Sequence, residues 1–197
     1  MSLQFVNYPV RAGARIFVEM TKECPMNRDQ QAADGQKRAI AVFEKRPNLA
    51  HVMNEGAATI TDGLACRFSD GSHAIEIDMP EAIGGTGTAP SPGYLGRAAI
   101  CSCIAIGIKM TATREKMALD TVSVSIEQDF DNRGVLGMPG ASAVPADTRI
   151  TIKIASSAPP IEVEALVHRA LRIDPWYLSF QNAQPVHVSC MTTEDVA

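Results

Sequence analysis

The feature that most constrains the fold is a long apolar segment over residues 92–116. Ser91 precedes Pro92, and a serine N-cap followed by proline at the first helical position is a typical helix start. The rest of the segment contains no proline, and residues 98–108 are apolar almost all round the helix rather than on one face. A helix of this kind is normally buried on several sides. The sequence therefore predicts a central helix with other elements packed around it.

Segments in which apolar and polar residues alternate lie on both sides of this helix and predict strands. Three precede the helix and two follow it, at residues 56–61, 64–68, 73–78, 119–130 and 149–155. Tight turns rich in glycine and aspartate join the first three, so we expect them to form an antiparallel meander.

Two further helices and a closing strand complete the predicted order. Pro159-Pro160 begins one helix, Asp174-Pro175 begins a shorter one, and residues 185–191 are predicted to be a strand. The order is βββ–α–ββ–α–β, in which helices are segregated from runs of strands. This pattern predicts an α+β fold with a long buried central helix and antiparallel sheets.

The first 50 residues differ from the rest of the chain. Residues 28–46 are rich in helix formers, and Pro47 ends that helix. We therefore divide the chain into an N-terminal extension, residues 1–50, and a main domain, residues 51–197. The extension has three open roles: to cover a pocket, to extend a dimer contact, or to cap an exposed sheet edge.

Composition and charge exclude several classes of function. The 18 basic and 22 acidic residues give a net charge of −4, which argues against nucleic acid as a partner. No stretch reaches the roughly 20 apolar residues of a membrane span, and the first residues lack the apolar core of a secretory signal. The five cysteines are an odd, scattered set, which favours a reducing cytoplasm over a disulfide framework. No motif predicts a metal site or a cofactor, because the GGTGTAP loop lacks the rest of a dinucleotide fingerprint.

Several short motifs, spread over residues 55–191, resemble the OsmC/Ohr superfamily of osmotically induced and organic-hydroperoxide-resistance proteins. They are Asp70-Gly71-Ser72-His73, Asp78-Met79-Pro80, the glycine loop from Gly84 to Pro92, Cys103 within the long helix, the loop from Arg133 to Gly137, and Asp174-Pro175. The resemblance implies an intertwined homodimer with the two long helices packed centrally. It also implies peroxide defence by thiol chemistry.

The resemblance assigns roles to a few residues. Cys103 occupies the position of the cysteine that attacks the peroxide and becomes a sulfenic acid. The second cysteine, which would form a disulfide with it, is replaced by Asp174. A glutamate expected just after Pro92 is replaced by Gly93 and Tyr94. The arginine that normally lowers the pKa of the attacking thiol has no clear counterpart, so the resemblance does not carry over the two-cysteine mechanism.

Two functions remain open from the sequence. The first is reduction of organic hydroperoxides by Cys103, with an external thiol as resolver and reductant. The second is a non-catalytic homodimer that binds an apolar small molecule or a protein partner. Asp174 is either a helix N-cap or a catalytic group, and Tyr94 either lines the pocket or packs at the dimer contact.

Overall fold

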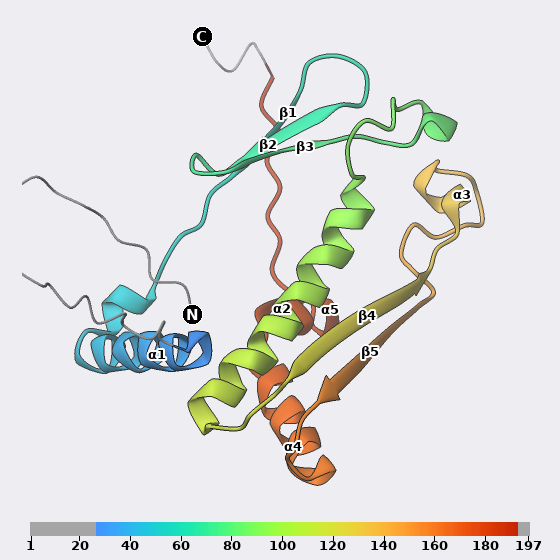
Figure 1. Ribbon diagram of the computed structural model, residues 1–197. Helices are drawn as coiled ribbons and strands as arrows, with labels where there is room; N and C mark the ends of the chain where they lie inside the picture. The colour runs from blue at the N-terminus through green and yellow to red at the C-terminus, as the bar shows by residue number, and fades with distance from the viewer. Residues whose placement is uncertain (1–26, 193–197) are drawn as a thin grey trace, which may run out of the picture.

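The structure is a computed structural model in which residues 27–192 are described. Its helices are α1 (Arg28–Lys45), η1 (Pro47–Ala50), η2 (Glu81–Ile83), α2 (Pro92–Glu115), α3 (Asn132–Val135), α4 (Pro160–Leu171) and α5 (Pro175–Gln181). Its strands are β1 (Ala57–Ile60), β2 (Cys66–Ser69), β3 (Ala74–Ile77), β4 (Thr121–Asp129) and β5 (Asp147–Ala155). The arrangement is α+β with two small antiparallel sheets and a long central helix, which confirms the predicted fold class (Figure 1).

Helix α2 begins and ends where the sequence predicts. The Ser91 hydroxyl accepts a hydrogen bond from the Tyr94 N–H at 3.3 Å, and Pro92 occupies the first turn, where no partner for its missing N–H is needed. The helix ends at Lys116, a residue with positive φ. Figure 1 shows α2 running from the three-stranded sheet at one end of the molecule to α4 at the other.

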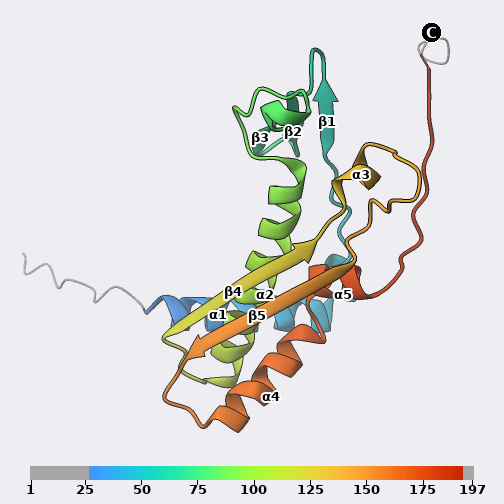
Figure 2. The same cartoon turned by 90° about the vertical axis from the view of Figure 1, so that its right-hand side faces the viewer.

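The hydrophobic core lies along one stripe of α2. Ile100, Ile104, Ile108 and Ala112, spaced four residues apart, are fully buried against Leu166 and other residues of α4 and the β4–β5 hairpin. Alternate residues of β4 and β5 point toward this stripe. Figure 2 shows the hairpin crossing beside α2, with α4 at the hairpin's open end.

The rest of the α2 surface is more exposed than the sequence predicts. Ile106, on the side away from the core, is 58% exposed, and Met110 is also exposed. The prediction of a helix buried on several sides is therefore met only in part within a single chain, because α4 and the hairpin bury one stripe of α2, α1 and α5 cover parts of other sides, and Ile106 stays uncovered.

The three-stranded sheet has no core of its own. Strands β1, β2 and β3 pair antiparallel in the order β1-β2-β3, and none of their residues is buried. Ile60, Phe68 and Ile75 expose apolar side chains on this sheet. A sheet needs an apolar partner layer to be stable, so both of its faces are available for one.

Helix α1 lies against the C-terminal half of α2 through polar contacts. The Gln36 amide donates to the Met110 carbonyl at 3.2 Å and to the Thr113 hydroxyl at 3.0 Å. The Lys109 ammonium pairs with Asp29 at 2.8 Å. Residues 1–26 of the predicted extension lie outside the described residues, and its boundary at residue 50 stays a prediction.

The predicted closing strand at residues 185–191 is wrong for the single chain. After α5, the described residues up to 192 are extended but belong to neither sheet, and Val188 is 90% exposed. Alternating apolar residues suit a β-strand, but a strand also needs a neighbouring strand with free backbone groups to form hydrogen bonds. In residues 27–192, no strand pairs with this segment.

By length and composition alone, α2 would be able to cross a membrane. The core helix of a soluble domain passes the same test, and α2 carries the core of this fold. The expectation of no membrane span therefore rests on the packing of α2 rather than on its hydropathy.

Candidate functional site

Cys103 lies on the face of α2 that packs against α5. Its side chain is partly buried, and its neighbours across the helix interface are the Asp174 carboxylate and the backbone N–H of Trp176. Burial raises the pKa of the Cys103 thiol, the Trp176 N–H acts in the opposite direction, and the negative charge of Asp174 raises it further. The resting state of this sulfur at neutral pH is therefore the protonated thiol.

Asp174 is buried at the start of α5, with 3% of its surface exposed. Its Oδ1 accepts a hydrogen bond from the Tyr177 N–H at 2.8 Å, which is the N-cap role that the sequence offers as one alternative. Its Oδ2 is also buried, and no group in residues 27–192 donates a hydrogen bond to it. The capping role therefore uses one carboxylate oxygen and leaves the other free.

Gly107 makes the close approach of Asp174 to α2 possible. A Cβ at position 107 would lie 3.2 Å from Asp174 Oδ2, tighter than most contacts of this kind. Gly107 follows Cys103 by one helical turn, so both residues lie on the same face of α2. The structure therefore brings Cys103 and Asp174 together, as two of the residues singled out from the sequence.

Tyr94 is not brought to this site within one chain. Its side chain is 57% exposed in the first turn of α2. The helical repeat puts it on the face opposite Cys103, about 13 Å away along the axis. Its two predicted roles, at a pocket or at a dimer contact, stay predictions.

The other described cysteines are placed differently. Cys101 packs against the core on another side of α2, and burial raises the pKa of its thiol. Cys66 lies on β2 and Cys190 is exposed in the C-terminal segment. Cys66, Cys101, Cys103 and Cys190 are all free thiols, and Cys24 lies outside the described residues.

No cation takes part in the electrostatics of Cys103 among the described residues. The groups that shift the pKa of its thiol are burial, the Trp176 N–H and the Asp174 carboxylate. Arg67, on the first sheet, forms an exposed pair with Glu76 on the neighbouring strand. No arginine within the described chain therefore favours the thiolate.

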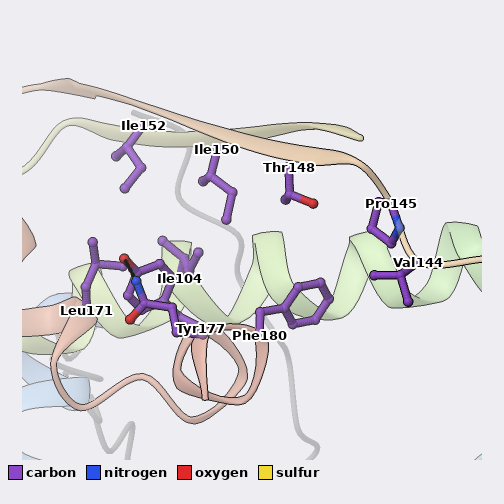
Figure 3. Close-up of a pocket in the computed structure, with 10 residues that line it drawn as sticks. Ile104, Val144, Pro145, Thr148, Ile150, Ile152, Leu171, Tyr177 and Phe180 are labelled. Carbon is purple, nitrogen blue, oxygen red and sulfur yellow. Dashed lines mark hydrogen bonds between the residues drawn. The ribbon is translucent and has the colours of Figure 1, made fainter. Parts of the chain in front are cut away.

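An apolar groove lies between β5 and α5, and Cys103 itself does not line it. It has a volume of about 640 Å³. Its lining residues are Ile104, Val144, Pro145, Thr148, Ile150, Ile152, Leu171, Tyr177, Phe180 and Gln181. Figure 3 shows the strand residues above the groove and Tyr177 and Phe180 facing them from α5. Tyr177 belongs to both the groove and the thiol site, because its side chain lines the groove and its backbone N–H donates a hydrogen bond to Asp174.

A buried carboxylate that the sequence analysis did not single out for a role organises the loop before α2. Asp78 accepts hydrogen bonds from the Met79 N–H at 2.7 Å and the Thr86 N–H and hydroxyl at 2.9 and 2.6 Å. The Thr86 hydroxyl and these N–H groups lower the pKa of Asp78 to about 2, against the cost of burial. At Gly85 a Cβ would overlap the Met79 carbonyl, so only glycine fits. The recurrence of threonine after Asp78 is a signal that could have pointed to this contact.

The described residues do not gather the ligands of a metal centre. In residues 27–192, no three histidine, cysteine, aspartate or glutamate side chains are close enough together to hold a metal ion. The candidate site therefore consists of the Cys103 thiol, the Asp174 carboxylate and the neighbouring groove.

Comparison with solved structures defines the class of the fold. An OsmC-like protein from Mycoplasma pneumoniae is similar with a TM-score of 0.56 and 11% identity, over 66% of this chain and 88% of that chain. An OsmC-like protein of unknown function from Vibrio cholerae is similar with a TM-score of 0.50 and 10% identity, over 66% and 94%. An organic hydroperoxide resistance protein OsmC from Legionella pneumophila has a TM-score of 0.49 and 22% identity, over 66% and 90%. The likenesses to the Mycoplasma pneumoniae and Vibrio cholerae structures show an OsmC-type fold.

A family model identifies the chain more specifically. The model for OsmC-like protein matches residues 85–189, which include α2, the β4–β5 hairpin, α4 and α5. The chain belongs to the OsmC-like family, as the motifs around Cys103 and Asp174 indicate. No curated protein matches the chain.

Proposed function

We propose that this chain is an OsmC-like protein of the peroxide-defence type in which Cys103 reduces organic hydroperoxides with an external thiol as reductant. The observation that carries the proposal is the placement of the Cys103 thiol. It sits partly exposed at the α2–α5 contact, next to a buried carboxylate, and α5 also lines an apolar groove. The groove suits the hydrocarbon part of an organic hydroperoxide.

The chemistry balances with one protein thiol. The Cys103 sulfur attacks the terminal oxygen of the hydroperoxide, an S–O bond forms, the O–O bond breaks, and an alcohol leaves once its oxygen is protonated. Cys103 becomes a sulfenic acid. One external thiol then forms a mixed disulfide with release of water, and a second external thiol restores Cys103 and leaves as the small disulfide.

The absence of a nearby second cysteine supports an external resolver. Cys101 lies on a different side of α2, and Asp174 occupies the position facing Cys103. A second thiol must approach within bonding distance to form a disulfide. The resolving thiol therefore comes from outside the described chain.

We propose in addition that the functional unit is a homodimer. The exposed α2 side chains Ile106 and Tyr94, which lie on different sides of the helix, and the uncovered three-stranded sheet present apolar surface that a second copy would bury. The acidic net charge supports a protein that does not bind nucleic acid, and the scattered cysteines support a cytoplasmic location. The core packing of α2 supports a protein that does not enter a membrane.

A second function is favoured by one observation. Burial and the Asp174 charge raise the pKa of the Cys103 thiol, whereas peroxide reduction needs a thiolate. The alternative is a non-catalytic dimer whose groove between β5 and α5 binds an apolar small molecule, or whose exposed apolar surface binds a protein partner.

Consumption of cumene hydroperoxide in the presence of dithiothreitol separates the two functions. The peroxidase function predicts turnover that Cys103→Ser abolishes and that Cys101→Ser, a matched control on the same helix, leaves intact. Because the pKa of the thiol is raised, alkylation of Cys103 by iodoacetamide, which needs the thiolate, should become faster as the pH rises across the neutral range. Absence of turnover, with an apolar ligand retained in native mass spectrometry, would instead establish the binding function.

A further inference from the structure

The buried and unpaired oxygen of Asp174 has no role in the fold. Oδ1 is bound by the Tyr177 N–H and completes the N-cap of α5, but Oδ2 receives no hydrogen bond from any described residue. Leaving a buried carboxylate oxygen without a donor costs free energy. A serine would cap the helix equally well without a second buried oxygen, so capping alone does not explain the carboxylate.

Oδ2 of Asp174 lies against the face of α2 that carries Cys103. A Cβ at position 107 would lie only 3.2 Å from Asp174 Oδ2, so the glycine makes room for this oxygen. Cys103 lies one turn earlier on the same face of α2. The thiol and the carboxylate are close enough for the charge of Asp174 to act on the sulfur. In the resting state the thiol retains its proton, and that proton must leave sulfur when the S–O bond forms.

We propose that Asp174 takes the thiol proton of Cys103 on Oδ2 and delivers it to the alkoxide that leaves the hydroperoxide. This inference rests on the proposed peroxidase function and gives Asp174 the role of its general acid. Sulfur is oxidised to the sulfenic acid, whose OH comes from the peroxide. The peroxide is reduced to the alcohol, and the carboxylate ends in the state in which it began.

The proposal explains how a thiol with a raised pKa could still react. A hydroperoxide releases a strongly basic alkoxide, so protonation of that oxygen in the transition state lowers the barrier even when little thiolate is present. General acid–base catalysis of this kind contributes about 10²–10⁴-fold to a rate. The apolar groove beside Tyr177 would hold the organic part of the substrate away from the polar pair.

The test compares two oxidants that differ in their leaving group. tert-Butyl hydroperoxide releases an alkoxide and needs a general acid, whereas peracetic acid releases acetate and does not. Asp174→Asn keeps a capping oxygen but carries no proton. It should reduce the rate of Cys103 oxidation by tert-butyl hydroperoxide about 100-fold and leave that by peracetic acid unchanged or faster.

A second variant and a second readout separate proton transfer from structure. Asp174→Ser also caps the helix and should show the same selective loss, with an unchanged near-ultraviolet circular dichroism spectrum. Removal of the carboxylate should also lower the pKa of Cys103 in an iodoacetamide alkylation profile against pH. Equal losses with both oxidants, or no loss with either, would overturn the proposal.

Failure of the proposed function is distinguishable from failure of this inference. If the wild-type protein reacts with neither oxidant, while Asp174→Asn still shifts the alkylation profile, the peroxidase function is wrong and the proton-transfer role is overturned with it. If the wild type reacts with both oxidants and Asp174→Asn behaves identically, the peroxidase function stands and only the role of Asp174 is wrong.

Discussion

The two sheets of this protein differ in how they are supported. The β4–β5 hairpin packs its alternate residues on α2 and α4, and the seven buried apolar residues of the core all lie in this region or at its edge. The three-stranded β1–β3 sheet has complete backbone pairing but no buried residue. Hydrogen bonding thus defines both sheets, whereas burial stabilises one of them within a single chain.

This difference shows what each region needs. The region of β4, β5, α2 and α4 is stabilised by contacts within the chain. Cys103 on α2 and Asp174 at the start of α5 lie next to it. The β1–β3 sheet and the exposed side chains of α2 have no such support within residues 27–192, and the homodimer proposed above would supply it. The measurements below test this contrast, beginning with the largest expected effect.

Removal of a core side chain in the supported region should have the largest effect on stability. Leu166 is fully buried against α2, so Leu166→Ala should lower the free energy of unfolding by about 2–5 kcal/mol. Urea denaturation followed by circular dichroism measures the loss. Val135→Ala, at an exposed position on α3, is the control and should change stability by less than about 0.5 kcal/mol. A small effect of Leu166→Ala would contradict the assignment of the core.

A charge on the unsupported sheet should act on assembly rather than on folding of the single chain. Ile60 is 56% exposed on β1, so Ile60→Asp would place a charge in the proposed dimer contact. We expect at least a tenfold rise in the dimer dissociation constant, about 1.4 kcal/mol, by sedimentation velocity. Val135→Asp, outside that contact, should leave the dimer intact. A wild-type protein that is monomeric at all concentrations would refute the proposed assembly.

The loop that joins the two regions should be sensitive to acid through Asp78. Its folded-state pKa is about 2, below the ordinary value of 3.8, because the loop donates hydrogen bonds to the carboxylate. This contribution is present above about pH 4 and is lost as the pH falls through about 2. Asp78→Asn should lower the melting temperature by about 5 °C at pH 7 and reduce the difference between pH 4 and pH 2. An identical acid response in both proteins would contradict this role.

The smallest effect is expected at the surface of the supported region. Arg169 on α4 donates two hydrogen bonds to Glu115 at the end of α2, and this pair lowers the pKa of Glu115. Both side chains are partly exposed, so water screens the interaction. Arg169→Ala should lower the melting temperature by no more than about 2 °C in a thermal scan. A loss of stability as large as that caused by Leu166→Ala would mean that the ion pair, rather than the apolar stripe of α2, holds α4 in place.

Local signals in the sequence predicted most elements of the fold. The Ser91-Pro92 start of α2, the meander before it and the Asp174 cap of α5 each depend on residues close in sequence. The strand at residues 185–191 depends on a distant edge, and the alternation of its residues gives no information about whether that edge is present. The apolar run of α2 predicts burial on several sides, but periodicity alone does not say which element covers each side.

The candidate site was only partly predictable. The sequence places Cys103 on the long helix and Asp174 at a later helix start, but their contact depends on the packing of α5 against Gly107. The free Oδ2 of Asp174 and the groove beside Tyr177 are properties of that packing. Asp78 was missed because its partners, Thr86 and Thr88, meet it only when the glycine loop closes.

The most direct test of this account is the fate of one sulfur atom. The reduced protein is treated with cumene hydroperoxide and then with dimedone, and the modified peptides are quantified by mass spectrometry. The account predicts one dimedone adduct per chain at Cys103, with Cys101 unmodified on the same peptide. Persistence of the hydroperoxide with no adduct at Cys103 would contradict it.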